Sequence, residues 1–321
     1  MRAVVFTGGG GNEVVTVAER PDPTVGPDDV LVAVEVAGMN PADLQQREGR
    51  YPAPPGVVPD VPGLEVAGSV VTIGERVTAW KSGDRVFGLV GGGGLASRVA
   101  VHERCVTRIP GGLDPEAAAA VPEAFITAHD ALRQGGLRPG ETVLVHGATG
   151  AVGSAAVAIA RASGARVLAP ARTPEAAEAV ATLGAEPVDA DREAIATAAG
   201  ARGVDLAVEL VGGAHVAIAL DVLAVGGRVV VVSVAGGSTV ELDLSRLMVR
   251  RATLRGTVLR ARPLDEKAAA VQAFAREVVP MLADGRVAPS IDSVYGVDEV
   301  HGAFDRLAAR GKRGKVMVRF T

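Results

Sequence analysis

The chain has few of the residues that build metal sites and disulfides. Its 321 residues include a single cysteine, Cys105, and five histidines, and no H-x-x-x-H or C-x-x-C spacing occurs. One cysteine excludes an intramolecular disulfide and a four-cysteine zinc site. We therefore expect no metal site, and because sparse cysteine use fits a reducing compartment we expect the chain to be cytoplasmic.

Long apolar runs, basic clusters and aromatic side chains are also scarce. No run of about 18 apolar residues occurs, which predicts no membrane span, and the glycine-interrupted N-terminus is unlike a signal peptide. The net charge of −4, without a basic run, argues against nucleic acid as a partner. Because aromatic residues make up only 3% of the chain, the core must consist mainly of Ala, Val and Leu.

The pattern of apolar residues changes twice along the chain. Up to about residue 115, short valine-rich runs such as Glu65–Ile73 are separated by Gly, Pro and Asp, which predicts a twisted antiparallel sheet or small barrel. Beyond residue 140, strands alternate with helices, starting with strand Thr142–His146 and helix Val152–Ser163, which predicts parallel βαβ units. Helical patterns over Asp265–Asp284 and Asp298–Arg310 then precede a terminal strand, which we expect to return to the first domain.

Two other segments carry helical patterns. The run between the first two stretches predicts two helices in series, with Asp114 as a plausible N-cap and Pro115 at the first helical position. Further on, a helix over Ala214–Val225 is expected to lead into a strand over Arg228–Val234.

The central motif is a glycine loop between a buried strand and an apolar helix. Gly147, Gly150 and Gly153 lie three residues apart in TVLVHGATGAVGSAAVAIARA. In such a unit one glycine permits a sharp turn, the next lets the backbone approach a pyrophosphate, and the third lets the helix pack close to the sheet. The N–H groups at the start of the helix then bind the phosphates. The loop therefore predicts a nicotinamide dinucleotide site.

The next strand predicts which dinucleotide is bound. NAD-preferring sites usually place Asp or Glu at its end to bind the 2′-hydroxyl of the ribose. Here the strand ends in APART, with no acid, and Arg172 could form a charge-assisted bond to a 2′-phosphate. This favours NADP(H); a solvated arginine at a helix start is the alternative.

Three other features have a structural and a functional interpretation. His146 and Cys105 are expected to be packed side chains. Tyr51 lies in the loop GRYPAPPG, where its phenol could donate a proton or simply pack on prolines. The run Leu254–Arg262 carries three arginines and is either a strand with a solvated face or a loop near an anion or cofactor.

The motifs together resemble the medium-chain dehydrogenase/reductase superfamily. Within it the chain is most similar to the zinc-independent NADPH:quinone oxidoreductases related to zeta-crystallin. The resemblance covers nearly the whole length and is carried by AGMNPADLQQREGRYPAPPG, VPGLEVAGSVVTIGERVTAWKSGDRVFGL, VPEAFITAHDAL, ETVLVHGATGAVGSAA, GGRVVVVSVAGG, LRGTVLRARPLDEK and GKVMVRF.

The resemblance implies an α/β protein of two domains. Residues 1–118 and 262–321 would form a partly open, GroES-like β-barrel catalytic domain, and residues 119–261 a doubly wound Rossmann domain, with the active site in the cleft between them. Zinc-dependent relatives carry a cysteine in the loop that here reads Gly38-Met39-Asn40, and G-H-E where this chain has Gly63-Leu64-Glu65. The metal ligands are therefore missing, and the resemblance implies zinc-independent, NADPH-dependent hydride transfer to a quinone or similar conjugated carbonyl.

The resemblance also assigns residues to the site. Asn40 and Asp43 match the N-x-x-D loop beside the nicotinamide, and Tyr51 takes the place of a tyrosine that donates a proton in related enoyl-thioester reductases. Asn40 and Tyr51 are thus the expected catalytic residues, polarising or protonating the acceptor. The remaining expected cofactor contacts are Thr127 at the nicotinamide, Gly147, Gly150, Ala151, Val152 and Gly153 in the phosphate loop, Arg172, Ser233 and Val234 at a strand end, and Leu259 and Arg260 in a closing loop.

Several alternatives remain open from the sequence. Many relatives carry a tyrosine near the 2′-phosphate where this chain has Asp191, whose charge weakens the preference for NADPH over NADH. The chain could instead be an enoyl-thioester or alkenal double-bond reductase, or a weakly catalytic NADPH-binding or RNA-binding crystallin-like protein. The acceptor and the choice of one- or two-electron reduction are not specified. A homodimer is expected through edge-to-edge pairing of Rossmann sheets near Thr253–Leu259.

Overall fold

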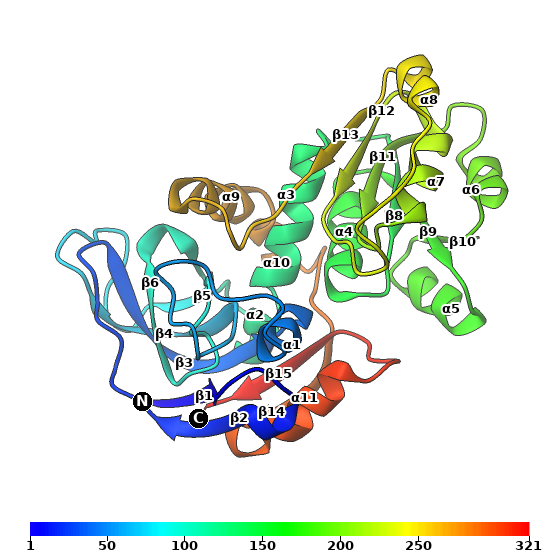
Figure 1. Cartoon of the computed structure of the whole chain (residues 1–321). Coiled ribbons are helices and arrows are strands. Elements are labelled where there is room, and N and C mark those ends of the chain that lie inside the picture. Colours follow the sequence, from blue (N-terminus) through cyan, green and yellow to red (C-terminus); the bar gives the residue numbers. More distant parts are fainter. Residues whose placement is uncertain (321) are drawn as a thin grey trace. The chain divides into compact units, whose positions relative to one another are not determined.

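The computed structural model describes residues 1–320 and divides into two compact units (Figure 1). The first comprises Met1–Ile126, Leu259–Ala283 and residues 288–320; the second comprises Thr127–Val258 and Asp284–Val287. From the sequence we expect domain boundaries between residues 118 and 119 and between residues 261 and 262, and this division remains a prediction. Thr321, the last residue of the expected catalytic domain, lies outside the described residues.

The first unit is rich in antiparallel strands. Its strands are β1 (Arg2–Phe6), β2 (Val15–Glu19), β3 (Asp29–Met39), β4 (Glu65–Ile73), β5 (Arg85–Leu89), β6 (Arg98–His102), β7 (Val106–Arg108), β14 (Ile291–Gly296) and β15 (Lys315–Arg319). Its helices are α1 (Pro41–Arg47), α2 (Pro115–Ala119), α9 (Leu264–Glu277), α10 (Val279–Ala283) and α11 (Val300–Ala308). Short 3₁₀ turns span Asn12–Val14, Glu103–Cys105 and Val297–Glu299, and a π-helical turn spans Pro122–Ile126.

One sheet forms the frame of this unit. Its strand order is β14-β15-β3-β4-β5-β7, and β6 also pairs with β3, while β1 and β2 form a separate antiparallel pair. The long strand β3 is mostly buried and is rich in valine, whose branched side chains suit a pleated sheet. The hydrophobic core of the first unit consists largely of valine and alanine, as expected from the scarcity of aromatic residues.

The second unit alternates strands and helices. Its strands are β8 (Thr142–His146), β9 (Arg166–Ala171), β10 (Glu186–Asp189), β11 (Val204–Glu209), β12 (Leu223–Val231) and β13 (Thr253–Gly256). Its helices are α3 (Thr127–Gln134), α4 (Ala151–Ala162), α5 (Pro174–Thr182), α6 (Arg192–Ala199), α7 (Ala214–Val222) and α8 (Leu244–Arg250).

All described strand pairs in this unit are parallel, in the order β10-β9-β8-β11-β12-β13. The chain order reverses between β8 and β11, which is the doubly wound arrangement expected from the sequence. Ligands of such sheets bind beyond the carboxyl ends of the strands at this reversal. A ligand of this sheet is therefore expected beside the residues that follow His146 and Glu209.

The structure corrects several expected element boundaries. The helix expected over Ala214–Val225 ends at Val222, and Leu223 already starts β12. The single helix expected over Asp265–Asp284 is two helices, α9 and α10, because Pro280 has no N–H to continue the helical hydrogen bonds. The two helices expected in series after Asp114 are separated by the π-helical turn. Every helix within residues 1–320 is too short or too polar to span a membrane.

Candidate functional site

The glycine loop lies at the carboxyl end of β8, where the strand order reverses. Gly147 has a φ of +78°, a conformation that other residues rarely adopt. A Cβ placed on Gly153 would lie 2.2 Å from the carbonyl oxygen of Gly147, so the loop and the first turn of α4 pack against each other without room for a side chain. Both glycines are required by the backbone geometry.

Helix α4 presents unused backbone donors at this loop. Gly150 is its N-cap residue, and the first helical bond runs from the N–H of Ser154 to the carbonyl of Gly150, at 2.8 Å. The N–H groups of Ala151, Val152 and Gly153 precede that bond and are left for a ligand or water. The structure thus brings the five expected phosphate-loop residues into one helix start, the arrangement that binds pyrophosphate.

A buried His–Glu pair lies directly beneath the loop. The Nδ1 of His146 lies 2.6 Å from Oε2 of Glu209, and the two side chains are 1% and 0% exposed. The other carboxylate oxygen of Glu209 accepts the N–H groups of Val211 at 2.7 Å and Gly212 at 2.9 Å. The pair therefore ties the end of β8 to the loop after β11. His146 is a packed strand-end residue, as expected.

These hydrogen bonds decide the ionisation of Glu209. Burial alone would raise the pKa of its carboxyl group, but the bonds from His146, Gly212 and Val211 outweigh burial and hold the pKa below its usual range. The carboxylate therefore accepts the Nδ1–H of His146. The other ring nitrogen of His146, Nε2, is buried and has no hydrogen-bond partner among residues 1–320.

Arg172 lies at the carboxyl end of β9, as expected for a residue near the adenosine ribose. Its guanidinium is exposed and has no hydrogen bond or ion pair with another described residue. Together with Asp189 it lines a cavity of about 410 Å³ between β9, β10 and α5. Asp191 instead caps α6, because its carboxylate accepts the N–H of Ala194 at 2.9 Å.

Three other expected cofactor contacts also lie in the second unit. Ser233 and Val234 line a cavity of about 370 Å³ just beyond the ends of β12 and β13. Thr127 is the first residue of α3, and its Oγ1 is buried without a hydrogen-bond partner in the described part of the chain. An unpaired buried hydroxyl is costly, so a ligand carboxamide would be a fitting partner.

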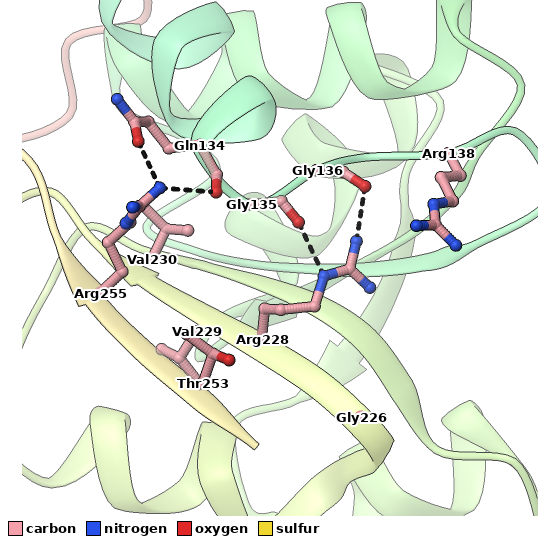
Figure 2. Close-up of a pocket in the computed structure, with 10 residues that line it drawn as sticks. All are labelled: Gln134, Gly135, Gly136, Arg138, Gly226, Arg228, Val229, Val230, Thr253 and Arg255. Atoms are coloured by element: carbon pink, nitrogen blue, oxygen red, sulfur yellow. Dashed lines mark hydrogen bonds between the residues drawn. The ribbon is translucent and has the colours of Figure 1, made fainter. Parts of the chain in front are cut away.

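A different cavity of this unit is lined by arginines that bond to neighbouring residues of the chain (Figure 2). It has a volume of about 430 Å³ and lies near the start of β12. The guanidinium of Arg228 donates to the carbonyls of Gly135 and Gly136 and to the carboxylate of Glu141. Arg255, from the arginine run, donates to the side chain of Gln134 at 2.6 Å. These arginines tie the end of α3 and the residues that follow it to the sheet.

In the first unit, the N-x-x-D loop is a closed hydrogen-bond network. Asn40 is the N-cap of α1, and its backbone N–H donates to Asp43 at 2.7 Å, while Asp43 also accepts the N–H of Gly63 at 3.0 Å. The side-chain oxygen of Asn40 accepts from Nζ of Lys315 at 2.5 Å, and its amide nitrogen donates to Glu65 at 2.9 Å. Both ends of the Asn40 amide are thus held within the chain.

Carboxyl groups gather around this network. Glu65, which is 0% exposed, pairs with the ammonium of Lys315, and its second oxygen accepts the backbone N–H of Glu123 at 2.8 Å. Burial raises the pKa of Asp43 to about 6, although two backbone N–H groups and the charge of Lys315 act in the opposite direction. Burial, followed by the charge of Glu65, raises the pKa of Glu123 to about 7.

Tyr51 and Arg260 form the second half of the site in the first unit. The guanidinium carbon of Arg260 lies 4.5 Å from the centre of the Tyr51 ring, a cation–π contact. Arg260 and its neighbour Leu259 are buried, and the guanidinium donates to the carbonyls of Tyr51 and Gly91 and to Gln46. The hydroxyl of Tyr51 has no hydrogen-bond partner among residues 1–320, and so remains available.

The sequence interpretation missed four charged residues of the two sites: Glu65, Glu123, Lys315 and Glu209. Glu209 follows a buried strand directly, and an acid at the end of a parallel strand is a usable signal. The other three give no local signal, because they come from β4, a π-helical turn and β15 and meet only in the folded chain. π-helical turns frequently occur at functional sites, so this turn is a further marker of a site. It is visible only in the structure.

Comparisons with protein families match both halves of the chain. Residues 26–111 match the family described as "Alcohol dehydrogenase GroES-like domain", and residues 151–276 match the family described as "Zinc-binding dehydrogenase". The first match covers strands β3 to β7 together with Asn40 and Tyr51, and the second begins at the N-terminus of α4.

Individual relatives match over nearly the full length. A protein named "Quinone oxidoreductase" from Lama guanicoe is 34% identical over 99% of this chain and 97% of its own length. The protein of that name from Homo sapiens is 32% identical over the same shares. A quinone oxidoreductase from Thermus thermophilus, solved also in its complex with NADPH, is 38% identical, covers 100% of both chains and has a TM-score of 0.83.

The residues present fit a nicotinamide dinucleotide but not a zinc ion. The fit to the dinucleotide rests on the glycine cradle, the open N–H groups of α4 and the unpaired hydroxyl of Thr127. For zinc, no group of three or more His, Cys, Asp or Glu side chains within residues 1–320 could hold a metal ion. The ammonium of Lys315 already lies against Asn40 and Glu65, so a cation is built into this network.

Proposed function

Because this chain belongs to the quinone oxidoreductases of the medium-chain dehydrogenase/reductase superfamily, we propose that it uses NADPH to reduce a quinone or a similar conjugated carbonyl. The observation that carries the proposal is the glycine loop at the strand reversal, whose helix start offers three unused N–H groups. The names of the mammalian relatives and the NADPH complex of the Thermus thermophilus relative support the same assignment.

The cofactor's parts would be bound by residues of the second unit. The N–H groups of Ala151, Val152 and Gly153 bind the pyrophosphate, and Arg172 binds the 2′-phosphate through its unpaired guanidinium. Thr127 hydrogen-bonds the nicotinamide carboxamide, and Ser233 and Val234 line the path towards it. When bound, NADPH supplies the hydride, and the protein supplies orientation and an environment of low polarity.

The acceptor would be bound by residues of the first unit. The free hydroxyl of Tyr51 donates a hydrogen bond to the acceptor oxygen, and Arg260 fixes the ring from which that hydroxyl projects. Asn40 and Asp43 anchor the start of α1 through their hydrogen bonds. Since both ends of the Asn40 amide are engaged, we propose that it positions the network rather than protonating the acceptor.

The experiment that tests this function is a panel of acceptors assayed with one enzyme preparation. NADPH oxidation is measured with ortho-quinones, para-quinones, enals and enoyl thioesters, and kcat/KM is compared across the classes. The proposal predicts the highest values for quinones. A preference for enoyl thioesters, with stereospecific uptake of a solvent proton on carbon, would show instead that the chain is a double-bond reductase.

We also propose that the reaction uses no zinc. The support is the ammonium of Lys315, which lies on the oxygens of Asn40 and Glu65 and leaves no place there for a second cation. Metal analysis of the purified active protein should find less than one zinc per chain, and dialysis against a chelator should leave kcat unchanged. Stoichiometric zinc that is lost together with activity would contradict this part.

The unit with the parallel sheet is proposed to pair with a second copy of the chain. Strand β13 is the exposed sheet edge, and Leu254 on it is 40% exposed. On the preceding helix α8, Met248 and Val249 are 75% and 79% exposed. An unpaired edge beside exposed apolar side chains is suited to strand pairing between copies.

Light scattering tests this pairing. Wild type should have the mass of a dimer, and Leu254→Lys should shift it to the monomer, whereas Val71→Lys, at a partly exposed valine of β4, should not. A monomeric wild type would contradict the proposal.

A small-molecule acceptor and a cytoplasmic location belong to the same proposed function.

A further inference from the structure

Glu123 carries a carboxyl group to which the proposed function gives no role. It is the second residue of the π-helical turn Pro122–Ile126, and π-helical turns often mark functional sites. Its side chain is partly accessible, and its carboxylate has no hydrogen bond or ion pair with any other residue from 1 to 320. A largely buried carboxyl group without a partner is costly, and this cost singles out Glu123 as a candidate functional group.

The neighbouring carboxyl groups differ from Glu123 because their oxygens are occupied. Glu65 pairs with Lys315 and accepts from Asn40 and from the backbone of Glu123. Asp43 accepts two backbone N–H groups. Neither can transfer a proton without breaking the network that holds α1 in place. Glu123 is therefore the carboxyl group of this cluster that is free to exchange a proton.

Charged groups act on Glu123 from several elements. Glu65 on β4 and Asp43 on α1 favour its protonated form, while Lys315 on β15 and Arg260 favour its ionised form. Lys267 on α9 also interacts with it. With burial as the largest effect, the balance raises the pKa of Glu123 to about 7, so near neutral pH it exists in both protonation states. General acids work best when their pKa lies near the working pH.

We propose that Glu123 is the proton donor of this site, acting on the acceptor bound beside Tyr51; the inference rests on the proposed quinone reduction. The acceptor gains two electrons and one hydrogen as hydride from NADPH. The O–H bond of Glu123 breaks, and its proton goes to an acceptor oxygen, giving the hydroquinone. The carboxylate of Glu123 then regains a proton from water. Tyr51 orients the acceptor by its hydrogen bond and does not lose its proton.

The pH dependence of kcat/KM for the quinone gives the first test. Because the acid form of Glu123 is the active one, wild-type kcat/KM should be constant below pH 7 and fall tenfold per pH unit above it. In Glu123→Gln the value at pH 6 should fall by about 100-fold or more, the usual contribution of a general acid, and the decline above pH 7 should disappear. Glu123→Asp should keep a titrating decline at a reduced rate.

Two controls separate this role from a structural one. Glu75→Gln, at an exposed glutamate of the same unit, should match wild type throughout, and Tyr51→Phe should lower the rate but keep the decline near pH 7. The affinity of each variant for NADPH, measured by cofactor fluorescence, should be unchanged. A Glu123→Gln enzyme with the wild-type rate at pH 6 and the wild-type pH profile would overturn the proposal.

A second measurement does not depend on turnover. Infrared difference spectra of the NADPH-bound protein between pH 6 and pH 8 should contain the carbonyl band of a protonated carboxyl group that Glu123→Gln lacks. Absence of that band would also overturn the proposal. By contrast, a wild-type enzyme that reduces no quinone at any pH would contradict the proposed function, whatever the state of Glu123.

Discussion

Each hydrogen bond that Glu209 accepts adds to the stability that the protein loses when this side chain is replaced. Its carboxylate is fully buried and accepts three hydrogen atoms: those on the backbone nitrogens of Val211 and Gly212, and that on Nδ1 of His146. A buried donor left without an acceptor costs about 1–3 kcal/mol. Glu209→Ala should therefore lower the free energy of unfolding of its unit by roughly 3–5 kcal/mol, allowing for partial rescue by water.

Glu209→Gln is the graded companion to this change. Its amide oxygen can still accept from Val211 and Gly212, but its NH2 group faces Nδ1 of His146. Nδ1 must then accept from this group, and the ring carries its proton on Nε2. That atom is buried and has no partner among the described residues, which leaves one unsatisfied donor instead of three. The expected loss is about 1–2 kcal/mol. Affinity for NADPH should fall in the same order, since the pair anchors the phosphate loop to the loop after β11.

Thermal unfolding and NADPH fluorescence titration measure both effects. Midpoints are compared between variants rather than converted to one global free energy, because a chain of two units need not unfold in one step. Glu178→Gln, an exposed glutamate on α5, serves as the control and should behave as wild type. If Glu209→Ala and Glu209→Gln lower the midpoint of thermal unfolding equally, or if neither changes the affinity for NADPH, the assigned hydrogen-bond network is wrong.

Three further predictions follow from single contacts. Gly153→Ala should weaken NADPH binding more than about 10-fold, because its Cβ would lie 2.2 Å from the oxygen of Gly147, while Gly111→Ala, whose Cβ meets nothing within 4 Å, should not; fluorescence titration decides. Arg172→Ala should lose about 10- to 100-fold in kcat/KM for NADPH but not for NADH, as expected for one charge-assisted contact to phosphate, and an unchanged ratio would remove Arg172 from the cofactor site. Arg260→Lys should reduce kcat/KM for the acceptor with NADPH affinity intact, since the single nitrogen of an ammonium cannot reach the three positions that Nε and the two Nη atoms of the guanidinium reach at Gly91, Tyr51 and Gln46; equal loss with both ligands would show a general folding defect.

The parts of the fold that depend on local pattern could be predicted from the sequence. The strand before Gly147, the glycine loop and α4 form one continuous segment, so turn chemistry and hydrophobic period suffice to place them. The predicted element boundaries were wrong where a tertiary contact overrides local propensity. Val222 and Leu223 have ordinary helical neighbours, but Leu223 pairs with Val204 in the sheet, and this tertiary contact ends the helix.

The charged network of the first unit could not be predicted in the same way. Lys315 and Asn40 are 275 positions apart, and only the pairing of β15 with β3 brings them together. The family resemblance pointed to Asn40, Tyr51 and Arg260, but not to Glu65 and Lys315, which engage the Asn40 side chain. It also gave no sign that Arg260 lies over the Tyr51 ring. Asp191 stands where many relatives carry a tyrosine, and we expect its charge to weaken the preference for NADPH. In the structure its carboxylate caps α6, and its effect on cofactor preference remains a prediction.

The most direct test of the proposed function is the rate of NADPH oxidation by the wild-type chain as a function of quinone concentration, with NADH measured in parallel. We predict saturable, quinone-dependent oxidation with one NADPH consumed per quinone reduced by two electrons, and a higher kcat/KM with NADPH than with NADH. A chain that binds NADPH but oxidises it no faster in the presence of any quinone than the uncatalysed reaction would contradict the proposed function.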